Sequence, residues 1–134
     1  MKPDDQLHEL PQNLRHERDA LQDAGLNTWG QIRQLDEIRI SRLAASGRAS
    51  ARNLKRVRGM AELVCDLDLA PADAALLMHA GLATVAAIAG STPQDVVNRT
   101  GRLERQLRSG RPPVVDLAVA RRWIRLAQER QNTN

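Results

Sequence analysis

A five-residue segment that occurs twice constrains the fold of this chain more than any other feature. Residues 24–28 read Ala-Gly-Leu-Asn-Thr, and residues 80–84 read Ala-Gly-Leu-Ala-Thr. Over the longer windows 21–32 and 77–88, six of twelve positions are identical. A glycine ends a helix by taking a left-handed conformation that other residues resist, and a threonine three residues later can cap the next helix. We therefore predict helix, tight turn and helix, formed twice.

Apolar periodicity and capping residues predict the other helices. In the first half of the chain we expect helices at 11–24, 29–35, 36–47 and 51–65, the third and fourth capped by Asp36 and Ser50. In the second half we expect helices at 71–80, 85–89, 93–100 and 116–131. Glycines and two prolines predict a basic loop over residues 101–115, with a short helix at 102–109 as an option within it.

Each helix carries apolar residues at helical spacing. The predicted inward residues are Leu14, Leu21 and Ala24 on the first helix, Leu54, Val57, Ala61 and Val64 on the fourth, and Leu117, Ala120, Trp123, Ile124 and Ala127 on the last. The third helix carries Ile38, Ile40 and Leu43, and we expect both Trp29 and Trp123 in the core. Ala and Leu dominate the composition, whereas Phe and Tyr are absent. Because Ala and Leu are strong helix formers, the predicted class is all-α.

The sequence offers no catalytic or metal-binding constellation. His8, His16 and His79 lack the spacing of a zinc-binding helix. Cys65 is the only cysteine and Asp66 follows it, so we expect a packed thiol in a reducing compartment. No apolar run reaches transmembrane length, and the N-terminus lacks the apolar region of a secretory signal. We expect a cytoplasmic protein that is not an enzyme and has no cofactor, no metal and no membrane partner.

The doubled pattern helix-Gly-Leu-x-Thr-helix resembles the helix-hairpin-helix superfamily. It is more closely similar to an uncharacterised bacterial family, a domain of unknown function built from two such units, over about residues 9–128. The most specific segments are 74–89 and 110–127, where Arg111-Pro112-Pro113 leads into the helix that bears Trp123. The resemblance implies an all-α fold of tandem degenerate helix-hairpin-helix-like repeats, packed as one compact helical domain, and implies no agreed activity.

This resemblance divides the chain into a flexible tail at 1–8, a helical repeat at 9–66, a second repeat at 67–131 with a basic insertion at 101–115, and a tail at 132–134. The predicted structural residues are Gly25, Thr28, Gly81, Thr84 and Trp123. Helix-hairpin-helix units that bind DNA carry a Gly-hydrophobic-Gly hairpin whose backbone N–H groups approach phosphates. The corresponding turns here, residues 10–13 and 69–72, have no glycine and each contains a proline. Backbone binding of phosphate is therefore disfavoured.

Charge is arranged in blocks along the chain. Residues 39–58 carry seven basic residues and no acidic one, whereas residues 59–98 carry five acidic residues and no basic one. Most basic residues are arginine, which recognises phosphate or carboxylate through two parallel hydrogen bonds. The predicted nucleic-acid- or partner-binding residues on the two repeat-ending helices are Arg48, Arg52, Lys55, Arg56, Arg121, Arg122 and Arg125. Further loop contacts are predicted at Arg99, Arg102, Arg105, Arg108 and Arg111.

Two functions fit these charges. The first is non-sequence-specific binding of double-stranded nucleic acid, DNA or RNA, through the arginine-rich helix faces. The second is a protein–protein interaction adaptor or assembly subunit that docks an acidic partner surface. A solvated basic face without a ligand is the remaining interpretation. The acidic block could pair with the basic block of a second copy, which would give salt-sensitive self-association, or balance that block within one molecule.

Overall fold

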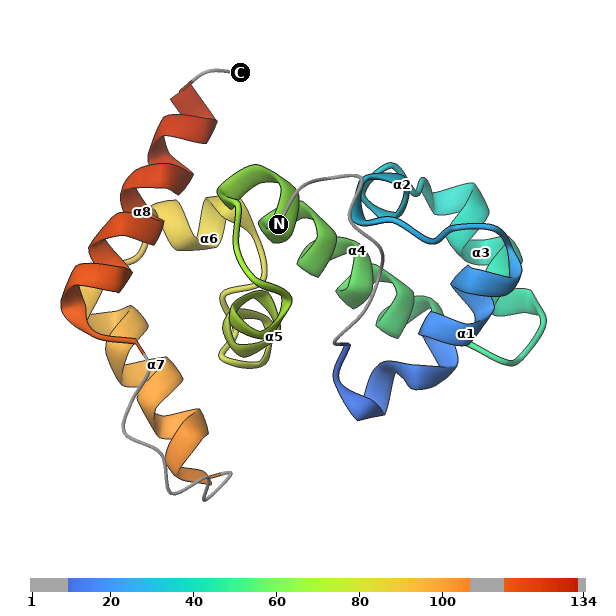
Figure 1. The fold of residues 1–134 in the computed structure, drawn as a ribbon, viewed down its shortest axis with the longest axis horizontal. Helices are drawn as coiled ribbons and strands as arrows, with labels where there is room; N and C mark the ends of the chain where they lie inside the picture. Colours follow the sequence, from blue (N-terminus) through green and yellow to red (C-terminus); the bar gives the residue numbers. More distant parts are fainter. Residues whose placement is uncertain (1–9, 107–114, 133–134) are drawn as a thin grey trace. The chain divides into compact units, whose positions relative to one another are not determined.

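The regular structure of the chain is helical (Figure 1). A computed structural model describes residues 10–106 and 115–132, without the side chains of 103–106. These residues contain no β-strand, so the predicted all-α class is confirmed. The chain divides into two compact units, Met1–Ala75 and Leu76–Asn134.

The first unit is built around its longest helix. The 3-10 helix η1 (Gln12–Leu14) and the helices α1 (Arg15–Asp23), α2 (Trp29–Arg33) and α3 (Glu37–Ala45) lead to α4 (Ala51–Leu67). Helices α1, α2 and α3 each contact α4 (Figure 1). The core of this unit includes the four predicted residues of α4 and apolar residues from the other helices: Leu14, Leu21, Trp29, Ile32, Ile40, Leu54, Val57, Ala61 and Val64.

In the second unit, the last helix packs on the two helices before it. Helix α5 (Pro71–His79) spans the boundary between the units and is followed by α6 (Val85–Ala89), α7 (Pro93–Gln106) and α8 (Leu117–Asn132). Helix α8 contacts both α6 and α7 (Figure 1). The core here includes Leu77, Leu82, Val85, Ile88, Val96, Ala120, Trp123, Ile124 and Ala127.

The two copies of the repeated segment have the same local structure. Gly25 has a φ of 80° and Gly81 a φ of 85°, in the left-handed region. In each copy, the N–H of the residue after the glycine donates to the carbonyl five residues earlier, at 2.9 Å in the first copy and 2.8 Å in the second. The hydroxyl groups of Thr28 and Thr84 accept the N–H three residues later, at 3.2 and 3.0 Å. Both segments thus end one helix with a Schellman motif and cap the next.

Two of the predicted inward residues, Ala24 and Leu117, need correction, and the exposure of Ile38 is a further finding. Ala24 is exposed because it lies at the C-cap of α1, and Ala20 is buried instead. Leu117 is 39% exposed because it is the first residue of α8. Ile38 is 64% exposed, whereas Ile40 is buried. Residues two positions apart on a helix point in directions about 200° apart, so Ile38 and Ile40 cannot both face α4.

The predicted end of the helix at residue 100 is also wrong, because α7 continues to Gln106. Gly101 lies inside the helix, where glycine costs only about 1 kcal/mol relative to alanine. Thr100 is buried, and its hydroxyl donates to the Val96 carbonyl at 2.8 Å within the helix. Residues 102–106 are helix-forming types, so the first part of the predicted loop is helical. The rest of that loop, 107–114, lies outside the described residues.

Candidate functional site

Two of the predicted binding residues at the start of α4 are held by acidic side chains of the same unit. Arg48, just before α4, has its Nη1 atom 2.8 Å from Oδ2 of Asp23. Lys55 has its Nζ atom 3.3 Å from Oε2 of Glu37, the first residue of α3. All four side chains are more than half exposed. The positive charges of Arg48 and Lys55 are therefore partly neutralised within the molecule.

Glu37 also binds a cation that the sequence analysis did not select. The Nη2 atom of Arg58 lies 3.1 Å from Oε1 of Glu37, and its Nη1 atom donates to the Leu35 carbonyl at 3.1 Å. Hydrogen bonds from Arg58 and Lys55 hold the pKa of Glu37 below its ordinary value. One carboxylate of α3 thus bridges two cations of α4. No local sequence signal could identify this contact, because Arg58 lies 21 residues after Glu37.

The other two predicted residues of α4 form no ion pair with any described residue. Arg52 lies in the first turn of α4 and is exposed. Arg56 is half-buried, and its Nη1 atom donates to Oδ1 of Asn53 at 3.4 Å. Of the four predicted residues in this region, Arg52 therefore has the most accessible positive charge.

The charges of α4 are ordered against its own helix dipole. Its first turn contains no acidic residue and its last turn no basic residue. Basic side chains fill the first half, whereas Glu62 and Asp66 lie in the second. A helix is stabilised by the opposite order, because its N-terminus carries a partial positive charge. The basic residues of α4 therefore lie at the end of the helix whose dipole is also positive.

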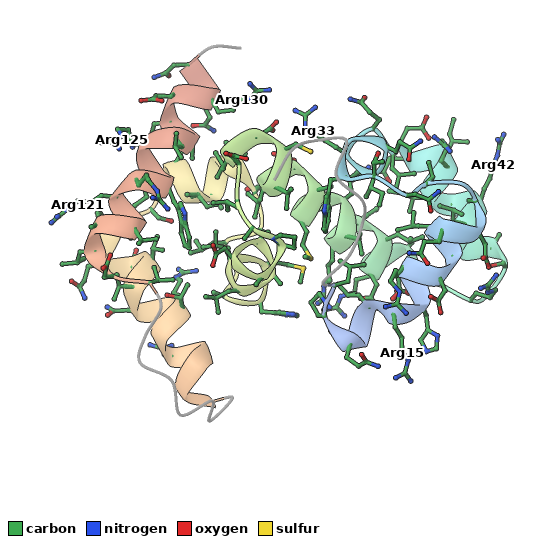
Figure 2. The ribbon with its side chains drawn as sticks, in the orientation of Figure 1. Arg15, Arg33, Arg42, Arg121, Arg125 and Arg130 are labelled. Carbon is green, nitrogen blue, oxygen red and sulfur yellow. The ribbon has the colours of Figure 1, made fainter. Side chains whose placement is uncertain are left out.

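The predicted arginines of α8 differ from Arg48 and Lys55 in their contacts with acidic side chains. Arg121, Arg122 and Arg125, here called the α8 arginine stripe, are all exposed. None of them forms an ion pair with a described residue, although Glu129 lies one turn beyond Arg125 on the same helix. Figure 2 shows Arg121 and Arg125 projecting from the same side of α8, away from α6. Among the described residues, this stripe is thus a basic surface without an acidic partner, on a helix whose other side is buried.

Two further predicted arginines lie on α7, which packs against α8. Arg99 and Arg102 are exposed. The Arg99 guanidinium lies close to the turn between α5 and α6. If Gly81 carried a Cβ atom, that atom would be 3.6 Å from Nη1 of Arg99. Arg105 belongs to α7 by its backbone, and its side chain lies outside the described residues, as do Arg108 and Arg111.

A partly buried ion pair joins α2 to the C-terminal half of α4. Arg33 contacts Oδ1 of Asp66 through Nη2 at 2.8 Å, and the Asp66 side chain is 8% exposed. The hydrogen bond to Asp66 raises the pKa of Arg33. Burial raises the pKa of the neighbouring Cys65 thiol, whereas the nearby Arg33 charge acts in the opposite direction. The ion pair between Arg33 and Asp66 links α2 to α4. The raised pKa leaves Cys65 largely as a neutral thiol.

Glu17 on α1 is a polar residue that sequence reasoning missed. It is buried, and its Oε2 atom accepts the Ser50 backbone N–H at 3.0 Å. Ser50 in turn caps α4 by accepting the Asn53 N–H. Glu17 therefore fixes the segment that precedes α4, on which Arg48 lies.

The remaining features of the described part of the chain concern metal binding, membrane spans and the two tryptophans. That part contains no group of three or more His, Cys, Asp or Glu residues able to hold a metal ion. Its helices include none long and apolar enough to cross a membrane. Trp29 and Trp123 are both buried, and their indole N–H groups have no hydrogen-bond partner. Neither indole offers a surface on which a nucleic-acid base could stack.

Comparison with known protein families identifies the family to which the chain belongs. The family model described as Domain of unknown function (DUF4332) matches residues 11–130. No curated protein and no solved structure matches the chain.

Proposed function

We propose that this chain, which belongs to the DUF4332 domain-of-unknown-function family, is a non-catalytic module that binds double-stranded nucleic acid without sequence preference. One observation carries the proposal: the α8 arginine stripe is exposed and forms no ion pair with any described residue. Phosphates are suited to this surface because each guanidinium can donate two parallel hydrogen bonds to phosphate oxygens.

The spacing of the stripe suits a polyanion better than a single anion. Arg121 and Arg125 are one turn apart, which corresponds to a rise of about 6 Å along the helix. A nucleic-acid duplex carries one charge per about 1.7 Å of its axis, so several phosphates lie within reach of one such helix. Contacts to phosphates position a protein on the duplex and carry no sequence information. The proposed binding is therefore driven by counterion release and falls steeply with salt.

Double-stranded nucleic acid is favoured over single strands by the aromatic content of the chain. Single-strand binding proteins stack bases on exposed aromatic side chains. The chain has no Phe and no Tyr, and both tryptophans are buried. Arginine contacts to a phosphate backbone need no such stacking surface.

The shared local structure of the two copies supports a common origin for them. In each unit, a five-residue helix with a threonine cap packs against a long helix, α2 on α4 and α6 on α8. We interpret the units as degenerate helix-hairpin-helix-like repeats of a bacterial type. In this interpretation, arginine side chains replace the backbone N–H groups of the usual hairpin.

A second candidate function is an adaptor that docks an acidic protein surface. The turns at the start of each copy favour it. Pro11 precedes η1 without capping it through a side chain, and Pro71 is the first residue of α5. Because proline has no backbone N–H, these turns are poor phosphate sites. The same arginines would then bind carboxylates of a partner.

Fluorescence anisotropy of a labelled duplex of about 24 base pairs, DNA and RNA separately, tests the proposal. The test variant is Arg121→Gln/Arg122→Gln/Arg125→Gln. The control, Arg15→Gln/Arg39→Gln/Arg42→Gln, removes three exposed arginines from the first unit, outside the predicted binding residues. At about 50 mM salt we expect micromolar binding, weakened at least tenfold by the test variant and less by the control. Absence of binding by the unmodified chain would contradict the proposal and leave the acidic protein partner.

A further inference from the structure

The basic residues around the start of α4 form a second surface, here called the α4 basic face: Arg48, Arg52, Lys55 and Arg58. Unlike the α8 arginine stripe, most of it is engaged by carboxylates. Asp23 at the end of α1 holds Arg48, and Glu37 at the start of α3 holds both Lys55 and Arg58. Only Arg52 of this face has no ion pair with a described residue. Two acidic side chains thus account for three of the four cations.

The two carboxylates have the properties of replaceable counterions. The side chains of Asp23 and Glu37 are each 65% exposed, so they do not need to be transferred from a buried site when they separate from their cations. Exposed ion pairs of this kind contribute little to stability, because water and salt screen them. By contrast, the Asp66 carboxylate that binds Arg33 is 8% exposed and is fixed in the structure. Displacement of Asp23 and Glu37 by another anion is therefore cheap.

The cations themselves lie where an anion is favoured. The first turn of α4 contains no acidic residue, and its partial positive charge adds to that of Arg52. One carboxylate, that of the buried Glu17, accepts the N–H of the N-cap residue Ser50, and it forms no ion pair with Arg52. The helix does not gain stability from basic residues at this end. Asp23 and Glu37 compensate for them from two other helices, α1 and α3. A polyanion would supply the same compensation with a higher density of charge.

We propose that the α4 basic face is a second phosphate-binding surface for nucleic acid, and that Asp23 and Glu37 mask it until the phosphate backbone displaces them. This inference rests on the proposed function. In the unbound protein, each carboxylate competes with phosphate for the same guanidinium or ammonium group. Masking lowers the affinity for nucleic acid and restricts binding at this face to ligands dense enough in charge to compete.

The test removes each mask and measures duplex affinity by fluorescence anisotropy at about 50 mM salt. The variants are Asp23→Asn, Glu37→Gln and the two combined. Glu62→Gln is the matched control: Glu62 lies on α4, loses the same charge and forms no ion pair with any described residue. Each measurement is repeated with the α8 arginine stripe replaced by glutamine, so that the α4 basic face is measured without the α8 surface. Circular dichroism verifies that each variant is folded.

We expect each unmasking substitution to tighten binding by about threefold to tenfold, because it removes both a competing ion-pair partner and a charge that repels phosphate. The gain should persist when the α8 stripe is removed, and Glu62→Gln should give less than about twofold. Equal gains for Glu37→Gln and Glu62→Gln would overturn the inference, because only net charge would matter. No gain, with clear binding by the unmodified chain, would overturn it as well. If neither the unmodified chain nor any variant binds, the proposed function itself fails.

Discussion

The turn glycines allow a sharp test of the fold, because the structure predicts opposite effects for the same substitution at different sites. Gly25 and Gly81 have φ angles of 80° and 85°, whereas Gly90, at the C-cap of α6, has a φ of −87°. A Cβ atom at Gly25 would meet no atom within 4 Å, and at Gly81 the nearest would be a guanidinium nitrogen at 3.6 Å. The cost of alanine at these two positions is therefore conformational and not a clash.

An alanine in the left-handed region costs roughly 1–2 kcal/mol, offset by about 0.4–1 kcal/mol from its less flexible unfolded state. We therefore expect Gly25→Ala and Gly81→Ala each to destabilise the protein by about 1 kcal/mol. For Gly90→Ala the backbone is right-handed and the nearest neighbour is at 3.5 Å, an ordinary contact. That variant should be neutral or more stable by up to about 1 kcal/mol.

Urea unfolding followed by circular dichroism measures all three variants against the unmodified chain. The magnitudes at Gly25 and Gly81 should agree within about 0.5 kcal/mol, because the two turns have the same geometry. A destabilisation at Gly90 as large as at Gly25 would refute the conformational argument. So would the absence of any effect at both turn glycines.

Three further predictions concern titratable groups. Cys65, whose pKa is raised by burial, should react with iodoacetamide at pH 8 several-fold more slowly than in the urea-unfolded chain; equal rates would contradict its packed position. Glu37, whose pKa is lowered by its two cationic partners, should stabilise the fold above the ordinary carboxyl range and lose that effect as the pH falls through its lowered value. Urea unfolding at pH 7 and about pH 3 should therefore show Glu37→Gln to be less destabilising at the lower pH. Glu17→Ala should cost about 1–3 kcal/mol by removing the charged acceptor of the Ser50 N–H, and Glu17→Gln, which retains an acceptor oxygen, should cost less in the same assay.

The sequence is informative where the determinants of structure lie close together in the chain. The turn at Gly25 depends on bonds between residues no more than five apart, and the cap at Thr28 on one three residues apart. These signals are readable without tertiary information, as are the cap residues Asp36 and Ser50. The apolar stripe of α4 was predictable for the same reason, since helical spacing alone places its residues on one side.

Contacts between distant residues were not predictable in this way. Glu17 and Ser50 are 33 residues apart, and so are Arg33 and Asp66. In the sequence, a block of basic residues lies next to acidic residues. That pattern is compatible with basic side chains that are neutralised by ion pairs and with basic side chains that are exposed and unpaired. Only the packing of α3 on α4 brings Glu37 to Lys55 and Arg58, so the state of that part of the candidate site depends on tertiary structure.

The end of α7 shows a different limit. The sequence predicts that the helix ends at Gly101, because glycine has low helix propensity and a glycine- and proline-containing stretch follows. Burial of Val96 and Thr100 on the same side of α7 outweighs a cost of about 1 kcal/mol for one glycine, so the helix continues to Gln106. Tertiary packing can thus override a local signal that is correct on average.

The salt dependence of duplex binding tests the central claim most directly. The unmodified chain and the variant with Arg121, Arg122 and Arg125 replaced by glutamine are titrated against one duplex between about 50 and 200 mM salt. If these three arginines each contact a phosphate, the slope of log affinity against log salt should be shallower in the variant by about 2.7, or about 0.9 per contact. Equal slopes for the two proteins would contradict the assignment of the α8 arginine stripe as the nucleic-acid surface.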